Sequence, residues 1–346
     1  MHKGFLVDRN VVAKDPHLSQ GCTSCHKGDD KSPTREGAHK GFASRPSEDP
    51  AVCATCHSLI AKNYKTSLHY TAAGLMTGAS GRFSEGEKKI FSGKVFEKSC
   101  RSCHASCGDC HVAQPKVSGI SAGLIKGHAF VKRDEGKTCA LCHGGRVYPE
   151  FTGDYGGSPD VHYQKGMLCV DCHKLTGLHG NGTAYRSRQE SGEKPSCVAC
   201  HKGGAEKSEK ARSSHATHRD KVACQACHAS APYRNCYDCH LGKGAQSKPG
   251  FFLGLNPRDK TKVTTLRLIP VVRDTFKDTG IGMARFDMLP NYWNASPHNI
   301  LKRTEQTRSC NVCHEEKKGF LTRESLIKGG SRANEGLIYA PKPLRQ

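Results

Sequence analysis

The chain contains few of the large apolar side chains that normally build a protein core. Leu, Ile, Val and Phe make up about 17% of its 346 residues, and there is a single Trp. A highly charged chain with less than about 20% of these four residues is usually disordered. We therefore expect this polypeptide to need a bound apolar group in order to fold.

Long apolar runs are also missing from the sequence. The most apolar stretch, residues 265–272, is interrupted by Arg267 and Pro270 and is much shorter than the roughly 18 residues of a membrane span. We therefore expect no transmembrane segment. Residues 1–20 lack the apolar segment of a signal peptide, so we expect the numbering to be that of a mature chain whose leader has been removed.

Cysteine, in contrast, is abundant and strictly spaced. All 20 cysteines belong to Cys-x-x-Cys-His motifs, and no cysteine is left over. The ten motifs begin at Cys22, Cys53, Cys100, Cys107, Cys139, Cys169, Cys197, Cys224, Cys236 and Cys310. Two of them follow each other within twelve residues, in the stretch CRSCHASCGDCH at residues 100–111.

This stretch alone leaves several chemistries open, since four close cysteines could hold an iron–sulfur cluster, a zinc ion or two disulfides. Zinc and cluster sites use paired cysteines but do not need a His next to each pair. Disulfides would not repeat one spacing ten times. In a c-type haem site both thiols form thioethers and the adjacent His binds the iron. The repetition therefore favours ten covalently attached haem c groups, with a cluster or zinc as the alternative.

This interpretation assigns a role to every cysteine and to half of the histidines. The cysteines that would form thioethers are Cys22, Cys25, Cys53, Cys56, Cys100, Cys103, Cys107, Cys110, Cys139, Cys142, Cys169, Cys172, Cys197, Cys200, Cys224, Cys227, Cys236, Cys239, Cys310 and Cys313. The motif histidines, which would be the proximal iron ligands, are His26, His57, His104, His111, His143, His173, His201, His228, His240 and His314.

Ten further histidines lie outside the motifs, which is one for every expected iron. They are His2, His17, His39, His69, His128, His162, His179, His215, His218 and His298. The matching counts predict that each iron has a second, distal His. His215 and His218 fall in a predicted helix at 205–218 and share a face there, so we expect them to serve two different haems, those of the motifs at Cys224 and Cys236.

From Cys22 to His314 the chain resembles the multihaem, and specifically decahaem, c-type cytochromes. It is similar to cytochromes of extracellular electron transfer, some of which form filaments (nanowires). The resemblance implies an elongated body organised around a haem chain, mostly irregular with short α-helices and little β-structure. It also implies an electron-transfer protein and not an enzyme, because two imidazoles leave an iron no open position. No Cys-x-x-Cys-Lys motif, a departure typical of multihaem enzymes, occurs.

Three forms of this function are compatible with the sequence. The first is a polymerised extracellular filament, in which a terminal haem takes a ligand from the neighbouring subunit; His2 or His17 could supply it. The second is a discrete decahaem carrier at the cell surface or in the periplasm. The third is a multihaem oxyanion reductase. The resemblance implies, as partners, redox proteins or extracellular acceptors such as metal oxides and other cells, together with self-association.

The motifs divide the chain into three regions. Residues 1–240 carry nine motifs, and residues 310–346 carry the tenth motif and a C-terminal tail. Residues 241–309 contain no motif, and β-branched residues at 262–276 predict one or two strands there. We interpret 241–309 as a haem-free lobe that packs over haems or serves as a polymerisation surface.

The formal net charge of +21 is at first sight typical of a nucleic-acid-binding protein. Ten haems would lower it, because their propionates contribute about −20 and ten ferric irons about +10, leaving about +11 oxidised and about +1 reduced. We expect Lys and Arg to pair with propionates. No nucleic-acid recognition module is visible, so no nucleic-acid partner is predicted.

Overall fold

The computed structural model describes residues 9–100, 104–113, 116–117, 120–121, 129–130, 135–202, 208–230, 233–234 and 250–344. Several predicted site residues lie outside the described residues. They are His2, Cys103, His128, Cys236, Cys239 and His240, together with the side chain of Cys100.

The chain forms two compact units whose segments alternate along the sequence. Unit 1 comprises Met1–Gly74, Ser102–Cys139 and His173–Glu193, and unit 2 comprises Leu75–Arg101, Ala140–Cys172 and Lys194–Gln346. Each unit contains several of the cysteine motifs.

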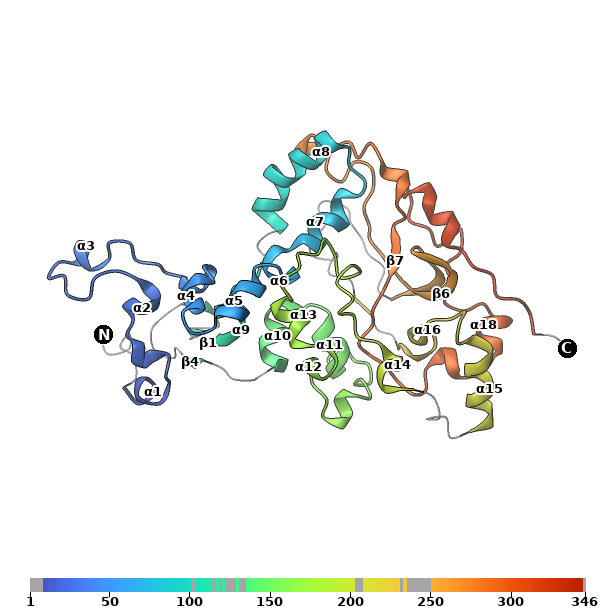
Figure 1. Cartoon of the computed structure of the whole chain (residues 1–346). Coiled ribbons are helices and arrows are strands. Elements are labelled where there is room, and N and C mark those ends of the chain that lie inside the picture. Colours follow the sequence, from blue (N-terminus) through green and yellow to red (C-terminus); the bar gives the residue numbers. More distant parts are fainter. Residues whose placement is uncertain are drawn as a thin grey trace. The chain divides into compact units, whose positions relative to one another are not determined.

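Most of the helices have only one or two turns (Figure 1). The α-helices of unit 1 are α1 Arg9–Lys14, α2 Thr23–His26, α3 Arg35–Ala38, α4 Ala51–Ala54, α5 Ser58–Tyr64, α6 Leu68–Thr71, α9 Cys107–His111 and α13 Leu175–His179. Those of unit 2 are α8 Glu85–Ile90, α11 Val147–Thr152, α12 Cys169–Cys172, α14 Cys197–Cys200, α15 Glu209–His218, α16 Cys224–His228 and α18 Asn311–His314. Two helices cross a boundary between the units, α7 Ala73–Ser80 and α10 Glu135–His143.

Strands are few, as expected. Short antiparallel pairs join β1 Val112–Ala113 to β4 Ala129–Phe130 and β2 Lys116–Val117 to β3 Ile120–Ser121. Short helices, irregular connections and little β-structure confirm the fold class predicted from the sequence.

Unit 2 also contains a three-stranded antiparallel sheet in the order β5 Phe252–Asn256, β6 Asp259–Leu268 and β7 Tyr292–Asn294. The strand predicted from β-branched residues is β6, which ends before Pro270, a residue with no N–H to donate to a neighbouring strand. The sheet lies in the segment without motifs. Its core consists of Leu266, Leu268, Tyr292, Leu321 and Leu337.

The predicted helix at 205–218 is present as α15 over Glu209–His218. It begins where the Ser208 hydroxyl accepts a hydrogen bond from the Ala211 N–H at 3.2 Å, which satisfies one of the free N–H groups of the first turn. Within the described residues, no helix combines the length and the apolar character needed to cross a bilayer.

A second core in unit 2 is built from aromatic side chains distant in sequence. The Phe83 ring lies 5.0 Å from that of Phe91 and 5.8 Å from that of Phe276, centre to centre. Beside this cluster, buried Arg82 donates to the carbonyl of Pro290 at 2.5 Å. These contacts join residues 82–91 to residues 276–290 without help from a motif.

We predict that Phe83→Ala lowers the free energy of unfolding of the haem-loaded protein by about 3–5 kcal/mol, because it leaves a cavity in this core. Phe83 is fully buried, whereas Met288 is 72% exposed, so Met288→Ala should change the free energy by less than about 0.5 kcal/mol. Denaturant unfolding followed by circular dichroism measures both. Equal losses in the two variants would contradict the prediction.

Candidate functional site

Each fully described motif forms a single turn of helix. The motif His donates its backbone N–H to the carbonyl of the first cysteine; this bond is 2.9 Å from His26 to Cys22 and 2.9 Å from His57 to Cys53. The same bond closes the motifs at Cys197 and Cys310, at 2.8 and 3.0 Å. Residues three and four apart on a helix share a face, so both thiols and the imidazole lie on one side of the turn.

The cysteines whose side chains are described are free thiols in every case. Neither the two cysteines of one motif nor cysteines of different motifs are joined by a disulfide among these residues. Within the described part of the chain, no group of three or more His, Cys, Asp or Glu side chains forms a metal-ion cluster. Two free thiols beside an imidazole are the groups that attach a porphyrin covalently.

Five motif imidazoles lie opposite an imidazole from outside the motifs, and the ring centres are 6.0–6.2 Å apart in all five pairs. The pairs are His57 with His17 (6.2 Å), His111 with His179 (6.0 Å), His201 with His162 (6.1 Å), His228 with His215 (6.1 Å) and His314 with His218 (6.1 Å). The first two pairs belong to unit 1 and the other three to unit 2.

This separation is what one metal ion between two imidazoles requires. A metal–nitrogen bond of about 2.0 Å on each side, and roughly 1 Å from each nitrogen to its ring centre, place the two ring centres about 6 Å apart. The pairs therefore have room for an iron ion that both rings bind.

Hydrogen bonds at Nδ1 orient several of these imidazoles. The ring–acceptor bonds are His17 to Asp15 (2.9 Å), His162 to Asp160 (2.9 Å), His218 to the Ser214 carbonyl (2.8 Å), His228 to the Leu301 carbonyl (3.0 Å) and His314 to the Lys342 carbonyl (2.6 Å). A carbonyl or carboxylate acceptor requires the hydrogen on Nδ1. The lone pair of the ring is then on Nε2, which is free to bind a metal.

Two of these acceptors, Asp15 and Asp160, are functional candidates that the motif analysis missed. Each carboxylate accepts both the ring N–H and the backbone N–H of the His two residues later, with backbone distances of 2.9 Å for His17 and 2.7 Å for His162. The sequence signal is the spacing Asp-x-His outside the motifs, at residues 15–17 and 160–162; the same spacing also occurs inside three motifs, at 109–111, 171–173 and 238–240.

Burial favours the neutral form of two other imidazoles. It lowers the pKa of His179, and the neighbouring His111 and His69 lower it further. Burial also lowers the pKa of His173, with a smaller contribution from the Arg188 guanidinium. The neutral ring is the form that binds metals.

The remaining described histidines have other neighbours. The ring centres of His26 and His39 lie 5.5 and 5.6 Å from the ring centre of Phe42. Among the described residues, His39 does not form a ring pair with a motif imidazole. His104 bonds through Nδ1 to the carbonyl of Tyr70, the residue after His69.

His298 contacts helix α11. Its backbone N–H donates to Glu150 at 3.2 Å, and Glu150 is on α11, the helix that follows α10 and its motif His143. Burial raises the pKa of Glu150 to about 7, and the Arg146 guanidinium partly opposes this shift.

Thiols of different motifs also lie close together. The Cys53 thiol lies beside the Cys107 thiol, and this proximity raises the pKa of Cys53 and lowers that of Cys107. Cys197 and Cys224 form an equivalent pair. The motifs that share such a contact are therefore spatial neighbours.

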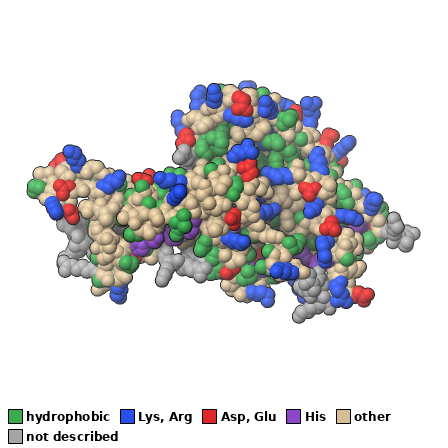
Figure 2. All heavy atoms as spheres, viewed as in Figure 1, with side chains coloured by type: hydrophobic (Ala, Val, Ile, Leu, Met, Phe, Trp, Pro, Cys, Tyr) green, Lys and Arg blue, Asp and Glu red, His purple; other side chains and the backbone are tan. Residues whose placement is uncertain are grey.

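Large apolar side chains are exposed next to the motifs. Leu141 and Val198, which lie inside motifs, are 67% and 63% exposed, and Leu59 and Leu175 just after motifs are similarly open. Figure 2 shows apolar groups reaching the surface among many Lys and Arg side chains. A porphyrin plate attached at each motif would cover such side chains, and Lys and Arg could pair with its propionates.

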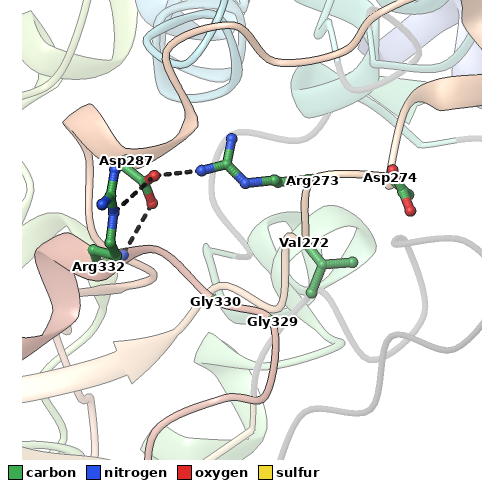
Figure 3. Close-up of a pocket in the computed structure, with 7 residues that line it drawn as sticks. All are labelled: Val272, Arg273, Asp274, Asp287, Gly329, Gly330 and Arg332. Atoms are coloured by element: carbon green, nitrogen blue, oxygen red, sulfur yellow. Dashed lines mark hydrogen bonds and ion pairs between the residues drawn. The ribbon is translucent and has the colours of Figure 1, made fainter.

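The pocket in Figure 3 belongs to unit 2, and none of its lining residues is part of a motif. It is lined by Val272, Arg273, Asp274, Asp287, Gly329, Gly330 and Arg332. Arg273 and Arg332 both form ion pairs with Asp287, and the Arg332 backbone N–H donates to the same carboxylate at 3.0 Å. The Arg332 backbone N–H and the two guanidinium groups lower the pKa of Asp287 although burial opposes them. Because Asp287 joins both arginines, we interpret this pocket as a structural ion-pair cluster.

Comparison with known proteins gives one family. Residues 161–245, which are 85 of the 346 residues, match the family model of cytochrome c3. No match is found among the curated proteins or among the solved structures. Four motifs begin in the matched range, and the imidazole pairs His162–His201 and His215–His228 lie within it. The match and these motifs support a multihaem c-type cytochrome, with covalently bound c-type haem and a role in electron transfer.

Proposed function

We propose that the chain carries ten haem c groups, each attached by two thioethers and bound by two imidazoles, and that it conducts electrons along them outside the cytoplasm. The observation that carries the proposal is the set of five imidazole pairs with ring centres 6.0–6.2 Å apart. Each pair combines one motif His with one His from elsewhere, as the equal counts of the two groups predict.

The pairs suggest a distal ligand for half of the haems. His17 would serve the motif at Cys53, His179 that at Cys107 and His162 that at Cys197. His215 would serve the motif at Cys224 and His218 that at Cys310. Five distal candidates remain, namely His2, His39, His69, His128 and His298. They would serve the five remaining motifs, which begin at Cys22, Cys100, Cys139, Cys169 and Cys236, in an order that we do not assign.

Two imidazoles favour electron transfer over bond chemistry. When bound, the haem supplies one-electron redox chemistry. The protein supplies two nitrogen ligands, which fill both axial positions and leave none for a substrate. The hydrogen bonds at Nδ1 hold these ligands in place. Such a site can change oxidation state with little rearrangement.

We further propose, from the resemblance to filament-forming cytochromes, that the protein works outside the cell and assembles into a filament. A discrete carrier at the cell surface or in the periplasm is the alternative. His17 lies opposite His57 of its own chain, so of the two N-terminal candidates only His2 remains as a ligand that one subunit could offer to another. Redox proteins would supply electrons, and extracellular acceptors would remove them.

We expect the purified, haem-loaded protein to contain ten haems and to give only low-spin ferric signals in electron paramagnetic resonance. The reason is that ten distal imidazoles are available for ten irons. A haem assay by absorbance in alkaline pyridine gives the count. A high-spin signal, or ready binding of carbon monoxide, would point instead to an open iron and a reductase.

The carboxylate beside a distal His should lower the reduction potential of its haem, because it makes the imidazole a stronger donor to the iron. We predict that Asp160→Asn raises the potential of one haem by on the order of 50 mV. Redox titration monitored by electron paramagnetic resonance measures the change. Glu85→Gln, which alters an exposed carboxylate bonded to Lys88, is the control and should leave all potentials unchanged.

Negative-stain microscopy of native material distinguishes filament from carrier. A filament predicts ribbons or fibres that retain the haem absorbance. Uniform small particles that persist at high protein concentration would exclude polymerisation and leave the discrete carrier.

A further inference from the structure

Helix α15 carries two of the candidate distal ligands, His215 and His218. His215 and His218 are three residues apart, so both side chains lie on the same face of the helix. The His218 ring bonds to the Ser214 carbonyl at 2.8 Å, and the helix is capped by Ser208. One helix therefore carries both imidazoles, and a hydrogen bond orients the ring of His218.

The two imidazoles face motifs that are far apart in the sequence. His215 faces His228, from the motif at Cys224, and His218 faces His314, from the motif at Cys310. The sequence led us to expect the motifs at Cys224 and Cys236 for this pair of histidines, without saying which served which; the partner of His218 is instead the His of the motif at Cys310. Figure 1 shows α15, α16 and α18 together in one part of unit 2.

Backbone contacts fasten the segment before Cys310 to helix α16. The Leu301 N–H donates to the His228 carbonyl at 2.8 Å, and the Ser230 N–H donates to the Asn299 carbonyl at 3.1 Å. The Thr304 hydroxyl donates to the Cys227 carbonyl. These bonds hold the chain that leads to the last motif directly against the motif at Cys224.

Thiols of different motifs in unit 2 also lie near one another. Cys227 and Cys313 lie close enough to interact electrostatically, as do Cys172 and Cys200. Cys197 and Cys224 also lie close together. The cysteines would be attached to porphyrin edges, so adjacent cysteines imply adjacent edges.

Resting on the proposed function, we propose that α15 holds the haems of the motifs at Cys224 and Cys310 side by side, and that electrons pass directly between them. The motifs at Cys224 and Cys310 are then consecutive along the electron path, although they lie far apart in the sequence. In this step one iron would be oxidised and its neighbour reduced, with no bond formed or broken.

The test uses the haem-loaded full chain and electron paramagnetic resonance of its ferric state. His218→Ala should give one high-spin haem in the parent chain and none in a chain with Cys310→Ser and Cys313→Ser, since the haem that lost its ligand is then absent. His215→Ala should give one high-spin haem in both chains. Thr217→Ala, an exposed neighbour on α15, should leave every haem low-spin.

The same variants test whether the two haems are neighbours. A paramagnetic neighbour shortens the relaxation time of the high-spin signal in His215→Ala. Removing the haem at Cys310 should therefore lengthen that time, whereas Cys22→Ser with Cys25→Ser should not change it. An unchanged relaxation time after removal of the haem at Cys310 would overturn the direct step.

His218→Met is the second variant, for the case that His218→Ala does not take up its haems. A Met ligand keeps the iron six-coordinate and raises its potential, and this raised potential should disappear with Cys310→Ser and Cys313→Ser. A high-spin or high-potential haem that survives their removal would overturn the assignment of His218. High-spin haem, or far fewer than ten haems, in the unsubstituted protein would instead overturn the proposed function.

Discussion

The orientation of the imidazole rings is the constraint on which the proposed sites depend. A neutral imidazole presents one lone pair, and it presents it toward a metal only when the other nitrogen has an acceptor for its hydrogen. Here those acceptors are backbone carbonyls and two carboxylates. Backbone carbonyls and carboxylates thus orient the ligands, so a chain poor in core residues can still position its imidazoles.

Local features could be predicted from the sequence, and the pairing of histidines could not. Motif turns are closed by bonds within five residues, and their number can be counted. Which motif imidazole a given His lies opposite depends on the long-range course of the chain. His17 and His162 precede the nearest motif by only five and seven residues, and each faces the following motif instead. His215, nine residues before Cys224, does face the His of that motif. The path of the chain in space, and not the separation in sequence, decides which motif each of these histidines faces.

The fold also combines local features that the sequence predicts with long-range contacts that it does not. Helix α15 and strand β6 were predictable because charge pattern and β-branched residues are local signals. The aromatic cluster around Phe83 was not, since its members come from residues 83–96 and from Phe276. Pairing of β7 with β6 likewise joins segments that are distant in the sequence. These contacts belong to parts of unit 2 in which side chains supply the core themselves.

The shared helix α15 also has a consequence for maturation. Because Cys310 is translated long after His218, a chain that acquires its cofactors as it emerges would hold the His218 ring without its metal until the last motif arrives. The backbone bonds from residues 299–304 to α16 would then act as the closing step, which seats the final cofactor against one already in place. Assembly of this end would accordingly be sequential, with its completion dependent on synthesis of the C-terminal segment.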